Sequence, residues 1–172
     1  MFALIKNNEV IQVGEPSQLF PNTSGANAEY AIEQGALKVI EGEQKDQRFY
    51  WVTFSHYDIT DSTVVRTYTN TPKALEDVTE TPEGQTDAVT TTGLKTQWIA
   101  QCKATAGSTL AQTDWCVTRK FERNIDIPEA IATERTKIVT DCDAKEAAIA
   151  ACTTVEELIA VVAPVYNSPT TE

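Results

Sequence analysis

The densest run of strand-forming residues, 48–69, places the strongest constraint on how this chain can fold. Aromatic and β-branched residues crowd its first arm, which ends at Asp58, and the second arm runs over residues 63–69. Such side chains are enriched in strands. The four residues between the arms, ITDS, are typical of a turn. The pattern therefore predicts an antiparallel β-hairpin.

Both faces of this predicted hairpin are apolar near its start, because side chains alternate across a strand. One face carries Phe49, Trp51 and Thr53, and the other carries Tyr50, Val52 and Phe54. We expect the rest of the sheet, a helix or a second copy of the chain to cover the two faces. Tyr50 and Trp51 are therefore candidate partner-binding residues, and a homo-oligomer is one expectation.

The rest of the first 71 residues is also predicted to be β-rich. Residues 2–6 and 9–13 form an expected hairpin around Asn7-Asn8, because asparagine tolerates the positive φ of a tight turn. A loop over 14–25, a short helix over 26–34 with Gly35 as its cap, and a strand over 37–41 follow. Residues 72–93 change to an acidic Thr/Pro/Gly-rich composition, which indicates a linker or an exposed loop.

Residues 94–172 are predicted to form a module of three helices. The first spans 94–106, with Trp98 on its apolar face and Gly107-Ser108 as its end. The longest spans 128–152, begins at Pro128 and has a narrow apolar stripe that suits a helix hairpin or a partner. The last spans 155–163 behind a Thr154–Glu157 capping box. The predicted fold class is thus α+β, with antiparallel hairpins first and helices last.

A turn-like segment, residues 110–128, is predicted to join the β-rich and helical halves. Trp115 offers it a large apolar anchor. The densest basic patch of the chain follows, and its members are Arg119, Lys120 and Arg123. These cations either form internal ion pairs with Glu122 and Asp126 or contact an acidic partner. Trp98 and Trp115 are likewise either core anchors or binding hot spots.

Composition narrows the classes of partner and site. A net charge of −11 at pH 7 argues against binding to nucleic acid or to an anionic membrane surface. The four cysteines form no C-x-x-C pair and stand far from the single histidine. We therefore expect free thiols in a reducing cytoplasm, with no metal and no cofactor. No signal peptide or stretch of about 18 apolar residues is present, so no membrane span is predicted.

The chain offers little for catalysis. His56 lies in a predicted strand, where Asp58 two positions on faces the same way. A small enzyme using His56 with Asp58 or Asp61 is one hypothesis, and a surface or packing histidine is the simpler one. No glycine-rich phosphate loop or G-x-S-x-G turn occurs. We expect a protein that is not an enzyme.

Two segments carry a resemblance to a known group of proteins. Residues 110–115, LAQTDW, lie between a Trp-bearing helix and a Pro-started helix, and the chain opens MFALIKNNEVIQV. Both resemble small tailed-bacteriophage proteins, which include tail fibre assembly proteins and virion-associated tail proteins. The resemblance implies a non-enzymatic protein that binds a tail fibre or baseplate protein. It would be made in the host bacterial cytoplasm and then act either as a virion tail component or as a transient assembly chaperone.

Overall fold

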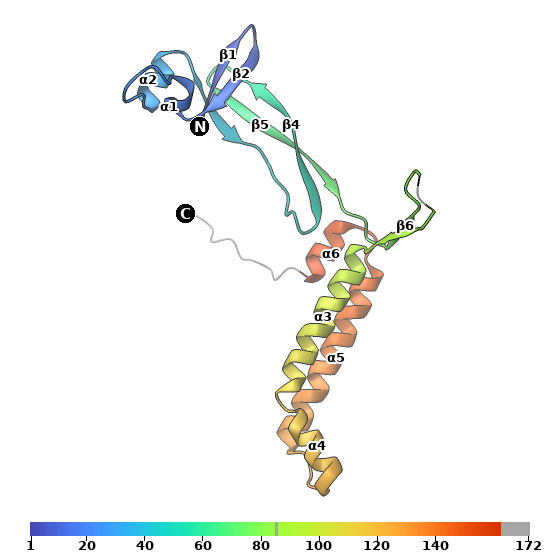
Figure 1. Ribbon diagram of the computed structural model, residues 1–172. Coiled ribbons are helices and arrows are strands. Elements are labelled where there is room, and N and C mark those ends of the chain that lie inside the picture. The colour runs from blue at the N-terminus through green and yellow to red at the C-terminus, as the bar shows by residue number, and fades with distance from the viewer. Residues whose placement is uncertain (85, 163–172) are drawn as a thin grey trace. The chain divides into compact units, whose positions relative to one another are not determined.

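The computed structural model divides the chain into two units, Met1–Pro72 and Lys73–Glu172. It describes residues 1–84 and 86–162. A five-stranded sheet and two short helices form the first unit, and a two-stranded sheet and longer helices form the second (Figure 1). The predicted α+β class is confirmed.

The five-stranded sheet of the first unit has the order β2-β1-β3-β5-β4. Its strands are β1 (Phe2–Lys6), β2 (Glu9–Gly14), β3 (Leu37–Glu41), β4 (Tyr50–Ile59) and β5 (Thr63–Pro72). β3 and β5 run parallel, whereas all other pairs are antiparallel. The expectation of a purely antiparallel module was therefore wrong. The parallel pair arises because β5, which returns antiparallel along β4, is the strand that lies beside β3.

The turn between β1 and β2 is left-handed at two successive residues. Asn7 has φ 53° and Asn8 has φ 63°. Two positive φ values in a two-residue loop match the right-handed twist of the flanking strands, and asparagine adopts them more readily than most residues. Sequence and backbone thus agree at this turn.

Two short helices, α1 (Pro16–Leu19) and α2 (Ala28–Glu33), pack beside the sheet. The expected loop over 14–25 was therefore wrong in part, because Glu15 and Gln18 form a capping box that begins α1. Asn27 begins α2 by accepting a hydrogen bond from the Tyr30 N–H over 2.9 Å. The core around these helices consists of Phe2, Leu19, Ala31 and Ala36, with Leu4 and Phe20 packed against it.

A β-bulge at Ser55 changes which side chains share a face of β4. Phe54 pairs with Tyr68 and His56 pairs with Thr67, so Ser55 has no partner of its own. Beyond the bulge, Tyr57 pairs with Arg66, which lies two residues from Tyr68 and on the same face. The bulge thus places Tyr57 on the face of Phe54, although the two are an odd number of residues apart.

The predicted linker over 72–93 contains a small sheet. β6 (Val78–Glu80) and β7 (Val89–Thr91) pair antiparallel, and all six residues are exposed. The hydroxyls of Thr79 and Thr90 lie 2.8 Å apart across the pair. The expectation of a segment without regular structure was wrong at these strands, because β-branched side chains face each other there.

The second unit contains four helices within its described residues, where three were predicted. They are α3 (Leu94–Ala111), α4 (Asp114–Arg123), α5 (Glu129–Ala151) and α6 (Val155–Val162). The fourth is α4, which replaces much of the expected turn-like segment. The helix predicted to end at Ala106 instead runs five residues further. Gly107 is exposed there, and the roughly 1 kcal/mol that an interior glycine costs is outweighed by packing on α5.

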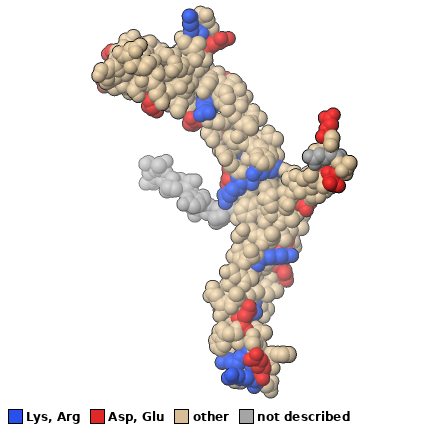
Figure 2. Space-filling view, in the orientation of Figure 1, with Lys and Arg blue, Asp and Glu red and all other residues tan. Residues whose placement is uncertain are grey.

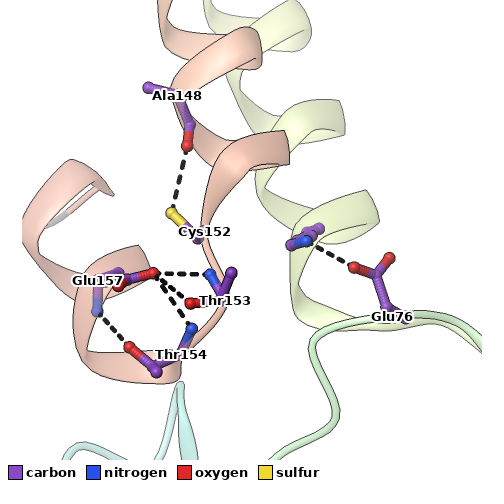
Figure 3. A network of polar contacts seen from close by, with 7 residues as sticks. Glu76, Ala148, Cys152, Thr153, Thr154 and Glu157 are labelled. Carbon is purple, nitrogen blue, oxygen red and sulfur yellow. Dashed lines mark hydrogen bonds and ion pairs between the residues drawn. The ribbon is translucent and has the colours of Figure 1, made fainter.

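α3 and α5 lie side by side and pack along a narrow seam (Figure 1). Leu94, Ile149 and Leu158 are the largest fully buried side chains of the second unit's helices. The predicted capping box of α6 is confirmed. The Glu157 side chain turns back to accept from the Thr153 and Thr154 N–H groups, at 2.7 and 3.3 Å (Figure 3). The Glu157 N–H donates to Thr154 Oγ1 over 3.2 Å.

Within residues 1–84 and 86–162, no helix has the length and apolar character needed to cross a membrane.

Candidate partner-binding surfaces

The helix α4 is an exposed element that only one side chain anchors completely. Gln112 and Thr113 separate it from α3, and Cys116 is its fully buried residue. Asn124 ends it in a left-handed conformation with φ 52°, and its N–H donates to the Lys120 carbonyl over 3.0 Å. Of its other residues, Arg119 and Lys120 are half-buried and the remainder are exposed.

Large apolar side chains are exposed on and just after α4. Phe121 is 92% exposed and Trp115 is 56% exposed. Val117, four residues before Phe121, is on the same side of the helix and is also exposed, as is Ile125. Trp115 was expected to be an apolar anchor, and this was wrong, because Cys116 takes the buried position of the first turn. We define these four residues and the basic patch of Arg119, Lys120 and Arg123 as the α4 surface.

The three cations of the α4 surface have different surroundings. The Arg119 guanidinium lies 4.8 Å from the centre of the Trp115 ring, in cation–π contact. Lys120 forms an ion pair with Asp126, and its hydrogen bond and charge lower the pKa of that carboxyl. Arg123 is exposed in the last turn. Lys and Arg side chains accordingly gather where α4 lies, with acidic side chains beside them (Figure 2).

Arg135 of α5 holds the start of α4 in place. Its Nη1 donates to the Leu110 carbonyl over 2.8 Å and to Thr113 Oγ1 over 2.7 Å. Its Nη2 donates to Asp114 Oδ1 over 2.9 Å. In the sequence, Arg135 is a charged residue that interrupts the apolar stripe predicted over 128–152. That interruption was the available signal for these contacts, since an arginine on the packed side of a helix needs hydrogen-bond acceptors for its guanidinium.

Trp98 does not share a surface with Trp115. It lies near the start of α3 and lines an open groove together with Cys102, Ile138 and Cys142. Thirteen residues separate Trp98 from the end of α3 at Ala111, so about 20 Å of helix intervenes before α4 begins. The two tryptophans are therefore separate candidates.

The two aromatic candidates of β4 point to opposite faces. Tyr50 is buried, whereas Trp51 is 62% exposed. The face that carries Tyr50 and Phe54 was also expected to be covered. Within the first unit, however, Phe54 remains 46% exposed. It belongs to a cluster in which the Arg66 guanidinium lies 5.4 Å from the Phe54 ring centre and 5.5 Å from that of Tyr68.

This cluster, which we call the β4–β5 aromatic face, extends to a second aromatic pair and to an acidic residue. The Phe54 and Tyr57 rings lie 4.9 Å apart. Tyr68 donates its hydroxyl to Glu41 Oε2 over 2.5 Å, and this hydrogen bond raises the pKa of Tyr68. Regular alternation along β4 missed the cluster, because the Ser55 bulge is what brings Tyr57 to the face of Phe54.

His56 lies in a line of polar side chains on the other face of β4. Ser55 Oγ is 2.9 Å from His56 Nδ1, and His56 Nε2 is 3.1 Å from Asp58 Oδ1. Thr67 donates to Asp58 Oδ2 over 2.6 Å, and this bond is the main cause that lowers the pKa of Asp58. Asp61 lies in the turn beyond β4. The histidine and aspartate side chains are both 57% exposed, so water reaches them freely.

The described residues contain no group of three or more His, Cys, Asp and Glu side chains that could hold a metal ion. No protein-family profile, curated protein sequence or solved structure matches this chain.

Proposed function

We propose that this chain is a non-enzymatic bacteriophage tail protein, a structural or adaptor component that binds a tail fibre or baseplate protein through the α4 surface. The resemblance to small phage tail proteins supports the proposal, since the LAQTDW segment spans the junction of α3 and α4. The observation that carries it is the 92% exposure of Phe121 on a helix whose other side presents the exposed Trp115 in contact with Arg119.

Exposed aromatic and arginine side chains are characteristic of binding hot spots. The Phe121 side chain has almost all of its apolar surface in contact with water. A partner that covers this surface therefore gains favourable binding free energy from its burial. The neighbouring cations stand out on a chain of net charge −11. They favour a partner with an apolar pocket and an acidic rim, because complementary charge speeds encounter and excludes wrong partners.

Substitution of Phe121 tests this role. Phe121→Asp should weaken binding to the tail fibre or baseplate protein of the same phage by at least about tenfold, since hot-spot truncations exceed about 2 kcal/mol. Thr118→Asp is the matched control: it adds the same charge to an exposed position of α4. It should change the dissociation constant by no more than about twofold. Equal affinity of Phe121→Asp and wild type would rule out the α4 surface.

Residence in the particle separates an adaptor from a transient tail fibre assembly chaperone. Mass spectrometry of gradient-purified particles should find an adaptor in fixed ratio to the fibre protein. A chaperone would be found only with free fibre in the lysate.

The virion tail is the location we propose, with the host cytoplasm as the place of synthesis. The partner class is protein, with neither nucleic acid nor membrane, and the β4–β5 aromatic face is the surface we assign to a homo-oligomer, with Trp51 exposed on the opposite face of the sheet.

The line Ser55–His56–Asp58 is the one observation that favours an enzyme. A histidine held between a hydroxyl and a carboxylate has the partners that nucleophile activation uses. Its place on an exposed strand face is unfavourable, because stabilisation of a developing charge needs preorganised donors away from water. His56→Ala would have to abolish a turnover for this alternative to hold.

A further inference from the structure

Two thiols face each other across the seam between α3 and α5. Cys102 Sγ and Cys142 Sγ lie 3.5 Å apart, although the residues are 40 positions apart in the chain. Cys102 Sγ also lies 4.0 Å from the Cys142 carbonyl oxygen. The two side chains are thus direct neighbours, and a move of roughly 1.5 Å would bring the sulfurs to the bonding distance of about 2.05 Å.

Both thiols are open to a small reagent. They are half-buried and line a groove of about 290 Å³ between the two helices, together with Trp98, Thr105 and Ile138. Cys116 and Cys152, the other two cysteines, are buried and therefore shielded. Access thus distinguishes the facing pair from the rest.

Charged neighbours set the order in which the two thiols react. Cys142 Sγ donates to Glu146 Oε1 over 3.4 Å, and Lys103 Nζ lies 3.0 Å from Glu146 Oε2. The hydrogen bond with Cys102, burial and Glu146 together raise the pKa of Cys142 to about 12. Cys142 therefore stays protonated at neutral pH, and Cys102 is the thiol that attacks first.

We propose that Cys102 and Cys142 form a redox-controlled disulfide that joins α3 to α5, and that it closes by exchange with a small-molecule disulfide. The Cys102 thiolate attacks one sulfur of the reagent and releases the first small thiol, which leaves a mixed disulfide on Cys102. Cys142 then attacks Cys102 Sγ and releases the second small thiol. Two protein thiols are oxidised and one small disulfide is reduced to two thiols, so atoms and electrons balance.

The first step prepares the second. The main cause of the raised pKa of Cys142 is its hydrogen bond with Cys102. Conversion of Cys102 to a mixed disulfide removes that bond, and the small thiolate released in the second step takes up the Cys142 proton. The closed loop contains α4, so the disulfide restrains the segment that carries the α4 surface.

Incubation of the full chain with oxidised glutathione tests the proposal. Wild type should lose about 2 Da, the mass of two hydrogen atoms, and peptide mapping should join Cys102 to Cys142. Closing this loop should raise the melting temperature by roughly 10 °C, and dithiothreitol should reverse the rise. Cys102→Ser and Cys142→Ser should each retain a glutathione adduct or free thiols without the rise.

Cys116→Ser is the control: because that thiol is buried and outside the facing pair, the variant should show the same loss of about 2 Da and the same rise in melting temperature on oxidation as wild type, whatever its starting value. A persistent glutathione adduct on wild-type Cys102, or a disulfide between two chains, would overturn the proposal. A Cys102–Cys142 disulfide that forms without changing the melting temperature would contradict the claim that this bond stabilises the packing of α3 on α5. The readouts are mass and melting temperature, so the result does not depend on which partner α4 binds.

Discussion

Arg135 of α5 and Asp114 of α4 form an ion pair in which Nη2 lies 2.9 Å from Oδ1. The same guanidinium also donates through Nη1 to the Leu110 carbonyl and to Thr113 Oγ1. Since the last carbonyls of a helix have no partner within it, Arg135 completes the end of α3 while it fixes the start of α4. One side chain thus controls the break between two helices.

Replacing Arg135 with methionine should therefore destabilise the helical unit by about 2 kcal/mol, the range for hydrogen bonds that involve a charged group. Lys137→Met is the control, because the Lys137 side chain is 73% exposed and its ion pair is with Asp141, one turn away on the same helix. It should change the free energy of unfolding by less than about 0.5 kcal/mol. Urea denaturation followed by circular dichroism measures both, and equal losses would contradict the role of Arg135.

Burial predicts a second contrast along α5. Ile149→Ala should cost about 3 kcal/mol, because Ile149 is fully buried and its truncation leaves a cavity. Val139→Ala should cost less than about 1 kcal/mol, since Val139 is 46% exposed. Chemical denaturation of the two variants gives the comparison. A loss at Val139 as large as that at Ile149 would show that another surface covers Val139 in solution.

The cap of α6 makes stability depend on acid. The backbone hydrogen bond from Thr153 is the main cause that lowers the pKa of Glu157. A carboxyl whose pKa is lower in the folded state stabilises the fold above its unfolded pKa, about 4.3, and loses that contribution as the pH falls through the folded pKa. The melting temperature of wild type should therefore fall more than that of Glu157→Gln when the pH is lowered from about 6 to about 3. Parallel curves would contradict the assignment.

Deletion of Ser55 tests the bulge. Without this unpaired residue, Phe54, His56 and Tyr57 alternate regularly, so every later side chain of β4 keeps its face. The deletion variant should remain folded, with an unchanged near-ultraviolet spectrum from the β4–β5 aromatic face. Insertion of a serine after Thr67 is the comparison: it shifts the register of β5 and should reduce stability. Loss of folding on deletion would mean that the bulge itself is needed.

The sequence allowed α5 and the cap of α6 to be predicted, because Pro128, the narrow apolar stripe and the Thr154–Glu157 spacing are local signals. α4 could not be predicted in the same way. Only Cys116 is fully buried there, so burial of apolar side chains contributes little to this helix. Its start depends on Arg135, which is 21 residues away from Asp114. Contacts of that kind are invisible to a local pattern.

The candidate surfaces also contain features that local sequence signals predict and features that depend on contacts between distant residues. The basic patch and Trp115 could be located from composition alone, and their exposure could not. The β4–β5 aromatic face was missed because one unpaired residue, Ser55, shifts the alternation for the rest of the strand. The Cys102–Cys142 pair was missed because the register of α3 against α5 decides which thiols meet, and a stripe on each helix leaves that register open.

The uneven burial within the helical unit implies a gradient of local stability. Leu94, Ile149 and Leu158 are fully buried, whereas α4 contributes only Cys116. Amide protons near the first three should exchange with deuterium only when the whole unit unfolds, and those of α4 should exchange through small local openings. A partner that binds α4 therefore slows exchange mainly in the segment that is least protected in the free protein.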